Sequence, residues 1–131
     1  MEKIFDLLVL GGGPGGYLCA ERAAQGGMNV CLFEKKSLGG TCLNEGCIPT
    51  KTLLNSAKLY RHATESDSFG VHTQDVTYDH AKVIARKNKV VKQLVSGVGA
   101  KLKKAGVEVV KASAVIKERN AEGFVVTAER G

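Results

Sequence analysis

Two cysteines, Cys42 and Cys47, stand five positions apart in a segment that also carries paired glycines and Lys51. Two thiols at a short spacing can form and break a disulfide, which is a two-electron redox reaction. On one ideal helix their Cα atoms would lie roughly 8 to 9 Å apart, beyond the reach of an unstrained disulfide. If the sulfurs bridge, we therefore expect a distorted helix and a bond that is easily reduced.

The residues around this pair predict reactive thiols. Residues 41–62 are expected to be mostly helical, with Pro49 accommodated near the beginning. The N-terminal end of a helix lowers the pKa of a nearby thiol, and Lys51 adds positive potential if its side chain faces the sulfurs. We therefore expect Cys42, close to the start of the helix, to ionise readily.

The remaining cysteines predict no chemistry. Cys19 and Cys31 are expected to be small, buried hydrophobic residues. A zinc site would need two ligands besides the closely spaced pair, and three histidines stand without ligand spacing: His62, His72 and His80. When only the spacing of Cys42 and Cys47 is considered, the alternative is that both thiols are inert.

A glycine-rich turn precedes the dithiol and predicts a phosphate-binding loop. Residues 11–16, which include Pro14 and Gly15, fit the pattern G-x-G-x-x-G. Gly11 permits the tight turn, Gly13 lets a pyrophosphate approach the backbone, and Gly16 allows close packing of helix on strand. The following helix directs free N–H groups and the positive end of its dipole at the phosphates.

Glu34 stands eighteen residues after Gly16, at the end of the second predicted strand. A carboxylate at that place accepts hydrogen bonds from an adenosine ribose and disfavours a 2′-phosphate. An ordinary glycine-rich turn is the alternative, but the strand before it, the helix after it and the acid together predict dinucleotide binding. The motif alone does not choose between FAD and NAD.

The apolar pattern predicts an α/β fold with a Rossmann-like, doubly wound parallel sheet. Buried strands are expected over residues 4–10, 29–33 and 107–110, and helices over 14–27, 41–62 and 79–105. The second helix should place Leu53, Leu54, Ala57 and Tyr60 on one side. Residues 114–117 and 124–128 predict a β-hairpin, the start of a β-meander. Little sequence is left to cover the far edge, so the sheet is expected to be incomplete.

Composition and charge narrow the class of protein. The chain has 131 residues, 44% of them hydrophobic, and is expected to form at most one domain. Its net charge of +6 comes from residues 79–104, where eight basic residues and one acidic residue flank an apolar helical stripe. We interpret the cations as a solvated face and expect no nucleic-acid partner. Without an evident signal peptide or membrane-spanning run, a cytoplasmic protein is expected.

The segment from Gly39 to Lys51, together with the glycine turn, resembles the active-site region of the pyridine nucleotide–disulfide oxidoreductases. Within that family the run Cys-Ile-Pro-Thr-Lys is most similar to the dihydrolipoamide dehydrogenase branch. The resemblance extends over essentially the whole chain, including residues 53–56 and 86–91.

The resemblance implies FAD bound by this chain through residues of several segments. Glu34 would hold the adenosine ribose, Gly40 and Thr41 would lie near the pyrophosphate, and Lys51 would lie near the flavin ring. The backbone around Ala114 would touch the adenine. Lys35 and Gly39 complete the set of cofactor-binding residues expected by this likeness.

The resemblance also implies the redox partners. Cys42 would be the thiol that meets dihydrolipoamide, free or on a lipoyl domain of a 2-oxoacid dehydrogenase complex or the glycine cleavage system. Cys47 would be the thiol beside the flavin, and electrons would pass through FAD to NAD⁺. Two rivals remain: a related NADPH-dependent disulfide or mercuric reductase, and a short nucleotide-binding or redox-sensing module without turnover.

Two departures from the family pattern are visible. Glu45 stands where members often carry an aliphatic residue, and a carboxylate facing the sulfurs would raise their pKa. Members of the family are also roughly three times as long and form homodimers. Residues 1–131 are therefore expected to be the N-terminal part of an FAD-binding domain, with the NAD and dimerisation domains outside this sequence.

Overall fold

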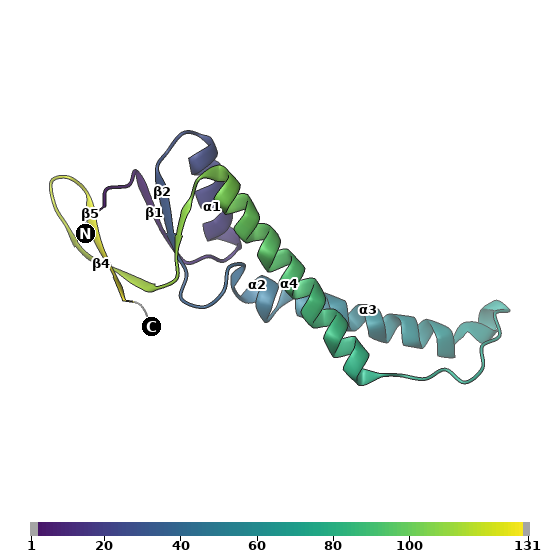
Figure 1. Ribbon diagram of the computed structural model, residues 1–131. Coiled ribbons are helices and arrows are strands. Elements are labelled where there is room, and N and C mark those ends of the chain that lie inside the picture. The colour runs from purple at the N-terminus through teal and green to yellow at the C-terminus, as the bar shows by residue number, and fades with distance from the viewer. Residues whose placement is uncertain (1–2, 130–131) are drawn as a thin grey trace.

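The structure is a computed structural model that describes residues 3–129 (Figure 1). The first half contains β1 (Leu7–Leu10), α1 (Pro14–Gln25), β2 (Val30–Phe33), α2 (Gly40–Asn44) and α3 (Cys47–Thr64). The second half contains a 3₁₀ turn η1 (Ser66–Phe69), α4 (His80–Ala105), β3 (Glu108–Val110), β4 (Ser113–Arg119) and β5 (Phe124–Glu129). The predicted element types are confirmed, with one exception in the segment that carries the dithiol.

Three parallel strands form the main sheet, in the order β1-β2-β3. Leu7 pairs with Val30, and Cys31 pairs with Glu108, so β2 lies in the middle. The short strands are rich in Val and Leu, as is typical of strands in a parallel sheet. The parallel order confirms the Rossmann-like prediction, and it gathers the carboxyl ends of all three strands at one edge.

The predicted hairpin is also confirmed. Strands β4 and β5 pair antiparallel as a separate two-stranded sheet, with an irregularity between Ile116 and Glu118. Asn120 shapes the turn, because its side-chain oxygen accepts hydrogen bonds from the N–H groups of Glu122 and Gly123. The hairpin follows β3 after two residues, which brings Ala114 close to the carboxyl end of the main sheet.

The core lies between the sheet and the helices α1, α2 and α4. Its fully buried side chains include Leu32 from β2 and Leu102 from α4. Ala20 of α1 is also fully buried, and its small side chain lets this helix lie close to the sheet. Leu43 of α2 joins the same core, so the segment carrying the dithiol is anchored to the sheet.

Helix α4 has well-defined ends. The Asp79 side chain accepts a hydrogen bond from the N–H of Lys82 at the start, and Gly106 adopts a left-handed conformation after the last turn. Val98 and Leu102 are buried near the sheet, while Leu94 is 41% exposed. The lysines of the helix lie mostly on the solvent side, as the predicted stripe required.

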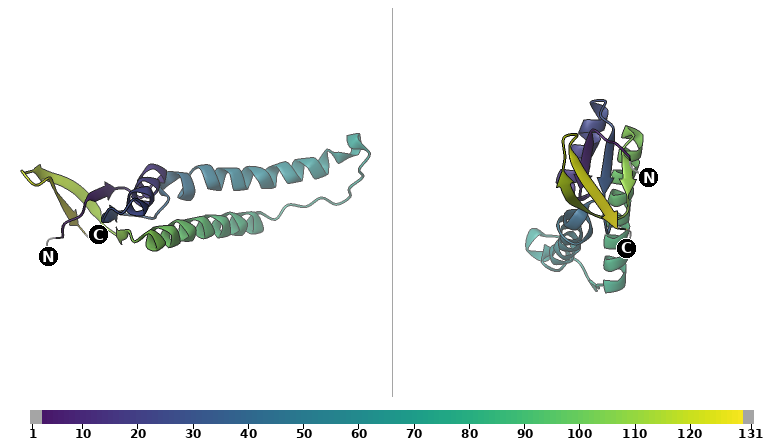
Figure 2. Two further views of the ribbon diagram at one scale, coloured as in Figure 1. Left: turned by 90° about the horizontal axis from the view of Figure 1, so that it is seen from above. Right: turned by 90° about the vertical axis from the view of Figure 1, so that its left-hand side faces the viewer.

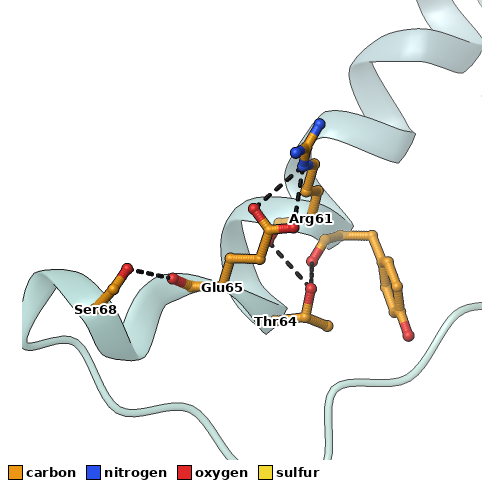
Figure 3. A network of polar contacts seen from close by, with 5 residues as sticks. Arg61, Thr64, Glu65 and Ser68 are labelled. Carbon is orange, nitrogen blue, oxygen red and sulfur yellow. Dashed lines mark hydrogen bonds and ion pairs between the residues drawn. The ribbon is translucent and has the colours of Figure 1, made fainter.

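Helices α3 and α4 run side by side and extend away from the sheet (Figure 2). At the end of α3, Arg61 and Glu65 form an ion pair at 3.1 Å, and the Thr64 hydroxyl donates to the carbonyl of Tyr60 (Figure 3). The Thr64 hydroxyl and the N–H of Glu65 also reach the carbonyl of Arg61, one of the last four carbonyls of the helix.

The predicted apolar side of α3 is only partly correct. Leu53 is half-buried, whereas Leu54, Ala57 and Tyr60 are exposed. The reason is that this part of α3 lies beyond the sheet and packs mainly against α4. The ring of Tyr60 meets Tyr78, which precedes α4, in an edge-to-face contact with centroids 6.3 Å apart.

No helix within residues 3–129 combines the length and the hydropathy that a bilayer-crossing helix requires.

Leu102→Ala should lower the free energy of unfolding by about 2–5 kcal/mol, because it leaves a cavity at the centre of the core. Leu59→Ala is the matched control, since Leu59 is 61% exposed and its truncation should change stability by less than about 1 kcal/mol. Chemical denaturation followed by circular dichroism measures both. Equal losses for the two variants would show that the core lies elsewhere.

Candidate functional site

The glycine turn between β1 and α1 has the backbone geometry that its spacing predicted. Gly11 has a φ of +108°, a conformation that favours glycine, and its N–H donates to the carbonyl of Phe33 at 2.8 Å. A Cβ added at Gly16 would lie 1.8 Å from the carbonyl oxygen of Gly11. Both positions therefore require glycine, as the roles of tight turn and close packing demand.

Helix α1 begins at this turn with free donors. Pro14 is its first residue, and the N–H of Tyr17 makes the first intrahelical bond, to the carbonyl of Gly13 at 2.9 Å. The N–H groups of Gly15 and Gly16 come before that bond and have no acceptor within the helix. Such a helix start attracts anions, because free N–H groups and the helix dipole act together.

Glu34 lies directly beside the turn. Its Oε2 accepts a hydrogen bond from the N–H of Gly12 at 2.8 Å, and its Oε1 accepts one from the N–H of Lys36 at 2.7 Å. These two bonds fix the orientation of the half-buried carboxylate. Each oxygen can still accept a further hydrogen bond from a hydroxyl group of a ligand.

A cavity of about 220 Å³ opens at the carboxyl edge of the sheet. Three residues named from the sequence, Glu34, Lys35 and Ala114, line it together with Gly11. The remaining lining comes from Leu10, Phe33, Ala112 and Ser113. In open α/β sheets, ligands bind outside the carboxyl ends of the strands, which is where this cavity lies.

A second pair of glycines joins the phosphate loop to the dithiol segment. The N–H of Gly39 donates to the carbonyl of Gly12 at 2.7 Å. Gly40 has a φ of +57°, and a Cβ there would lie 2.8 Å from the Cα of Gly13. Two backbones therefore touch at this point with no room for a side chain.

The dithiol segment departs from the predicted continuous helix. Helix α2 ends at Asn44, and α3 begins at Cys47. Gly46 leaves the helical conformation at φ −126° and ψ −105°, so the ideal-helix separation does not apply to the two cysteines. Pro49 falls in the first turn of α3, where its missing N–H costs no intrahelical bond.

The two cysteines meet across this break as free thiols. Cys42 is half-buried near the start of α2, Cys47 is the exposed first residue of α3, and the two thiols are near enough to shift the pKa of Cys42. The hydrogen bond to Cys47 is the largest cause that raises the pKa of Cys42, followed by desolvation, while the charge of Lys51 lowers it. The predicted depression of this pKa is therefore wrong. The effect of Cys47 on the pKa of Cys42 is larger than the opposing effect of Lys51.

The Glu45 carboxylate lies on the other side of the break. Its Oε1 is 3.9 Å from Nζ of Lys36, and both side chains are exposed. Glu45 is not among the charges that shift the pKa of Cys42. The predicted electrostatic effect of Glu45 on this thiol is therefore not observed.

The other two cysteines differ from each other. Cys31 is buried in β2, and burial, followed by the charge of Glu108, raises its pKa to about 11. Cys19 is exposed on α1, so its predicted burial is wrong. It precedes Ala20, which is fully buried in the core. Within residues 3–129, no group of three or more His, Cys, Asp or Glu side chains is placed to hold a metal ion.

Two residues with a role in this geometry were missed. Asn44 donates from its side-chain amide to the carbonyls of Leu38 and Gly40. Leu43 anchors α2 in the core. The position of Asn44 between the two cysteines was the available signal, because a short polar side chain at the end of a helix often bonds to nearby backbone.

Comparison with known sequences identifies similar proteins. The family model described as "Pyridine nucleotide-disulphide oxidoreductase" matches residues 5–130. The dihydrolipoyl dehydrogenase of Acholeplasma laidlawii is 50% identical over 121 residues, which cover 92% of this chain and 36% of that protein. The dihydrolipoyl dehydrogenase of Chlorobaculum parvum is 49% identical over 127 residues, which cover 97% of this chain and 27% of that protein. This chain therefore spans about a third or less of the length of these relatives.

Comparison with solved structures supports the same fold. The crystal structure of LpdA from Mycobacterium tuberculosis superposes with a TM-score of 0.78 over 93% of this chain and 29% of that chain. The sequence identity is 22%, so this likeness concerns the fold alone.

Cys47→Ala should lower the pH at which Cys42 becomes alkylated, because it removes the hydrogen bond that raises the pKa of Cys42. In the parent protein, Cys42 stays protonated to a higher pH than an ordinary thiol, so its alkylation rate should rise only on the alkaline side of the usual range. Rates of iodoacetamide labelling against pH, resolved by peptide mass spectrometry, measure this. The exposed Cys19 is the internal control. An unchanged or higher midpoint in Cys47→Ala would contradict the assignment.

Proposed function

This chain belongs to the pyridine nucleotide-disulphide oxidoreductase family, and we propose from this premise that residues 1–131 form the N-terminal part of an FAD-binding domain. Proteins of this family use FAD and NAD(H), which agrees with the cofactors expected from the sequence. The proposed activity is that of a dihydrolipoyl dehydrogenase, to which this segment contributes the flavin cradle and the redox disulfide.

One observation carries the proposal. The dithiol segment touches the phosphate loop through Gly39 and Gly40, so a dinucleotide bound at the loop lies next to Cys42 and Cys47. A dinucleotide site and a hydrogen-bonded thiol pair in direct backbone contact match a reaction that moves electrons between sulfur and a bound cofactor.

The chemistry of the described residues fits the adenosine and pyrophosphate parts of FAD. The Glu34 carboxylate would accept hydrogen bonds from the adenosine ribose, with Lys35 beside it and Ala114 against the adenine. Free N–H groups at the start of α1 would hold the pyrophosphate, with Gly40 and Thr41 on its other side. Lys51, one turn after Cys47, would lie near the flavin ring.

The proposed reaction begins with a thiolate of dihydrolipoamide attacking Sγ of Cys42 in the Cys42–Cys47 disulfide. The disulfide breaks, Cys47 leaves as a thiolate, and a mixed disulfide joins the substrate to Cys42. The second substrate thiolate then attacks the substrate sulfur of that mixed disulfide, which releases lipoamide and the Cys42 thiolate. This thiolate takes up one of the two protons that the substrate thiols gave up. A hydrogen bond from Cys42 stabilises the charge on Cys47. Bound FAD would supply the acceptor for the two electrons of the dithiol, and NAD⁺ would be their final acceptor.

The proposal extends to partners and place in the cell. The substrate would be dihydrolipoamide, on a lipoyl domain of a 2-oxoacid dehydrogenase complex or of the glycine cleavage system. The functional unit would be a homodimer in the cytoplasm. The names of the relatives at about 50% identity support this class of substrate.

Glu34→Gln should weaken FAD binding by about tenfold, which corresponds to about 1.4 kcal/mol. The amide has one acceptor oxygen, so it cannot accept from Gly12 and Lys36 at once and still serve a ribose. Glu122→Gln in the turn after β4 is the control, because this exposed side chain lines no part of the cavity. Flavin fluorescence during titration measures the affinity. An unchanged dissociation constant would remove Glu34 from the cofactor site.

Cys47→Ser in the protein at its full natural length should abolish the long-wavelength band that a thiolate gives beside an oxidised flavin, and should abolish lipoamide-dependent turnover. Serine keeps the size and the hydrogen bond of the thiol but holds no thiolate. Cys19→Ser is the control and should leave both signals intact. Anaerobic titration with dithiol under absorption spectroscopy measures the band, and its persistence in Cys47→Ser would overturn the proposed function.

A further inference from the structure

Asn44 is the last residue of α2 and stands between the two redox cysteines. Its side-chain Nδ2 donates two hydrogen bonds, one to the carbonyl of Leu38 at 3.0 Å and one to the carbonyl of Gly40 at 2.9 Å. An amide nitrogen has two hydrogens, so both donors are used. The side chain is half-buried and thus partly protected from competition by water.

The loop that Asn44 holds is the one that touches the phosphate loop. Leu38 and Gly40 flank Gly39, whose N–H bonds to the carbonyl of Gly12 at 2.7 Å. Gly39 and Gly40 both have positive φ, at +94° and +57°. Such a loop has weak conformational preferences of its own, because glycine is the most permissive residue. The amide of Asn44 spans this stretch and bonds to the residue on either side of Gly39.

Packing and hydrogen bonds together fix α2. The helix has five residues, too short to be stable by its own hydrogen bonds. Leu43 packs into the core, its N–H donates to the carbonyl of Gly39 at 3.3 Å, and the helix contacts α3 and α4. The Asn44 side chain adds a tie from the last residue of α2 to Gly40, its first residue, and to Leu38 in the preceding loop.

We propose that Asn44 is a positioning residue for the redox dithiol. Its amide ties the end of α2 to Gly40, the first residue of the helix, and to Leu38 in the preceding loop, and thereby sets both the approach of Cys42 to Cys47 and the place of the pair relative to the phosphate loop. This inference rests on the proposed function only where it concerns electron transfer between the thiol pair and a cofactor. The effect on the thiol pair itself needs no cofactor.

The test is the thiol–disulfide equilibrium of the pair in glutathione buffers, measured on the full natural-length protein with and without FAD. In that equilibrium, Cys42 and Cys47 lose two protons and two electrons to one glutathione disulfide, giving the protein disulfide and two glutathione thiols. A looser α2 lowers the effective concentration of one thiol at the other. Acid quenching, alkylation and mass spectrometry give the ratio of the two forms.

Asn44→Ala should lower the equilibrium constant for disulfide formation by about tenfold, equivalent to about 30 mV. Asn44→Ser should show a smaller loss, because a serine hydroxyl can bond to the carbonyl four residues back, here Gly40. Asn88→Ala is the matched control, since Asn88 is exposed on α4 and its side chain accepts a hydrogen bond from the adjacent Lys87. In the FAD-loaded protein, the long-wavelength band per bound flavin should fall in the same order.

Two results would overturn the inference. One is an equal equilibrium constant in Asn44→Ala and the parent, and the other is a loss in Asn44→Ala that Asn44→Ser does not reduce. If the alanine variant fails to fold, an unchanged constant in Asn44→Ser decides against it. Because the equilibrium is also measured without FAD, a protein that gives the graded loss but binds no flavin would keep this inference and refute the proposed function.

Discussion

The close contact between two glycine-containing backbones is the constraint on which the rest of the site depends. Gly39 bonds to the carbonyl of Gly12, and any side chain at Gly40 would collide with the Cα of Gly13. Glycine weakens most local structures, since it adds chain entropy to the unfolded state. Here the missing side chains of the glycines let two loops from different parts of the chain come into direct backbone contact. A phosphate site and a thiol pair can then share one small volume.

The core explains why this contact is held rigidly. Strand β2 lies in the middle of the sheet, and the helices α1, α2 and α4 meet over it. Leu43 brings α2 into that same apolar cluster, so the dithiol segment has no core of its own and follows the sheet. Close-packed side chains of this kind fit together in one arrangement, so the position of α2 on the sheet is fixed. The orientation of Glu34 follows from the same frame, because its two hydrogen bonds come from residues at the ends of β1 and β2.

Local spacing was enough to predict the elements and the glycine turn, because strands, helices and the roles of Gly11 and Gly16 depend on neighbours in sequence. The features that were missed depend on contacts across the fold. The break at Gly46 is one, since Pro49 indicated an irregular start but not where the helix would split. The pKa of Cys42 is another, because a hydrogen bond to Cys47 opposes the field of Lys51. Cys19 was misplaced because the sequence does not say which side of α1 meets the sheet.

The positions of the two cysteines on their helices also account for a difference in exposure. Cys42 lies on the short helix α2, which packs against the core, and its side chain is half-buried. Cys47 is the first residue of the long helix α3 and is exposed. Thiol exchange needs one sulfur that an outside thiolate can reach and another that stays beside the electron acceptor. In the described residues alone, the more open sulfur is Cys47, the one expected to face the flavin. The assignment of Cys42 to the substrate therefore requires that bound FAD cover Cys47, because a flavin stacked on that sulfur would leave Cys42 as the approachable atom.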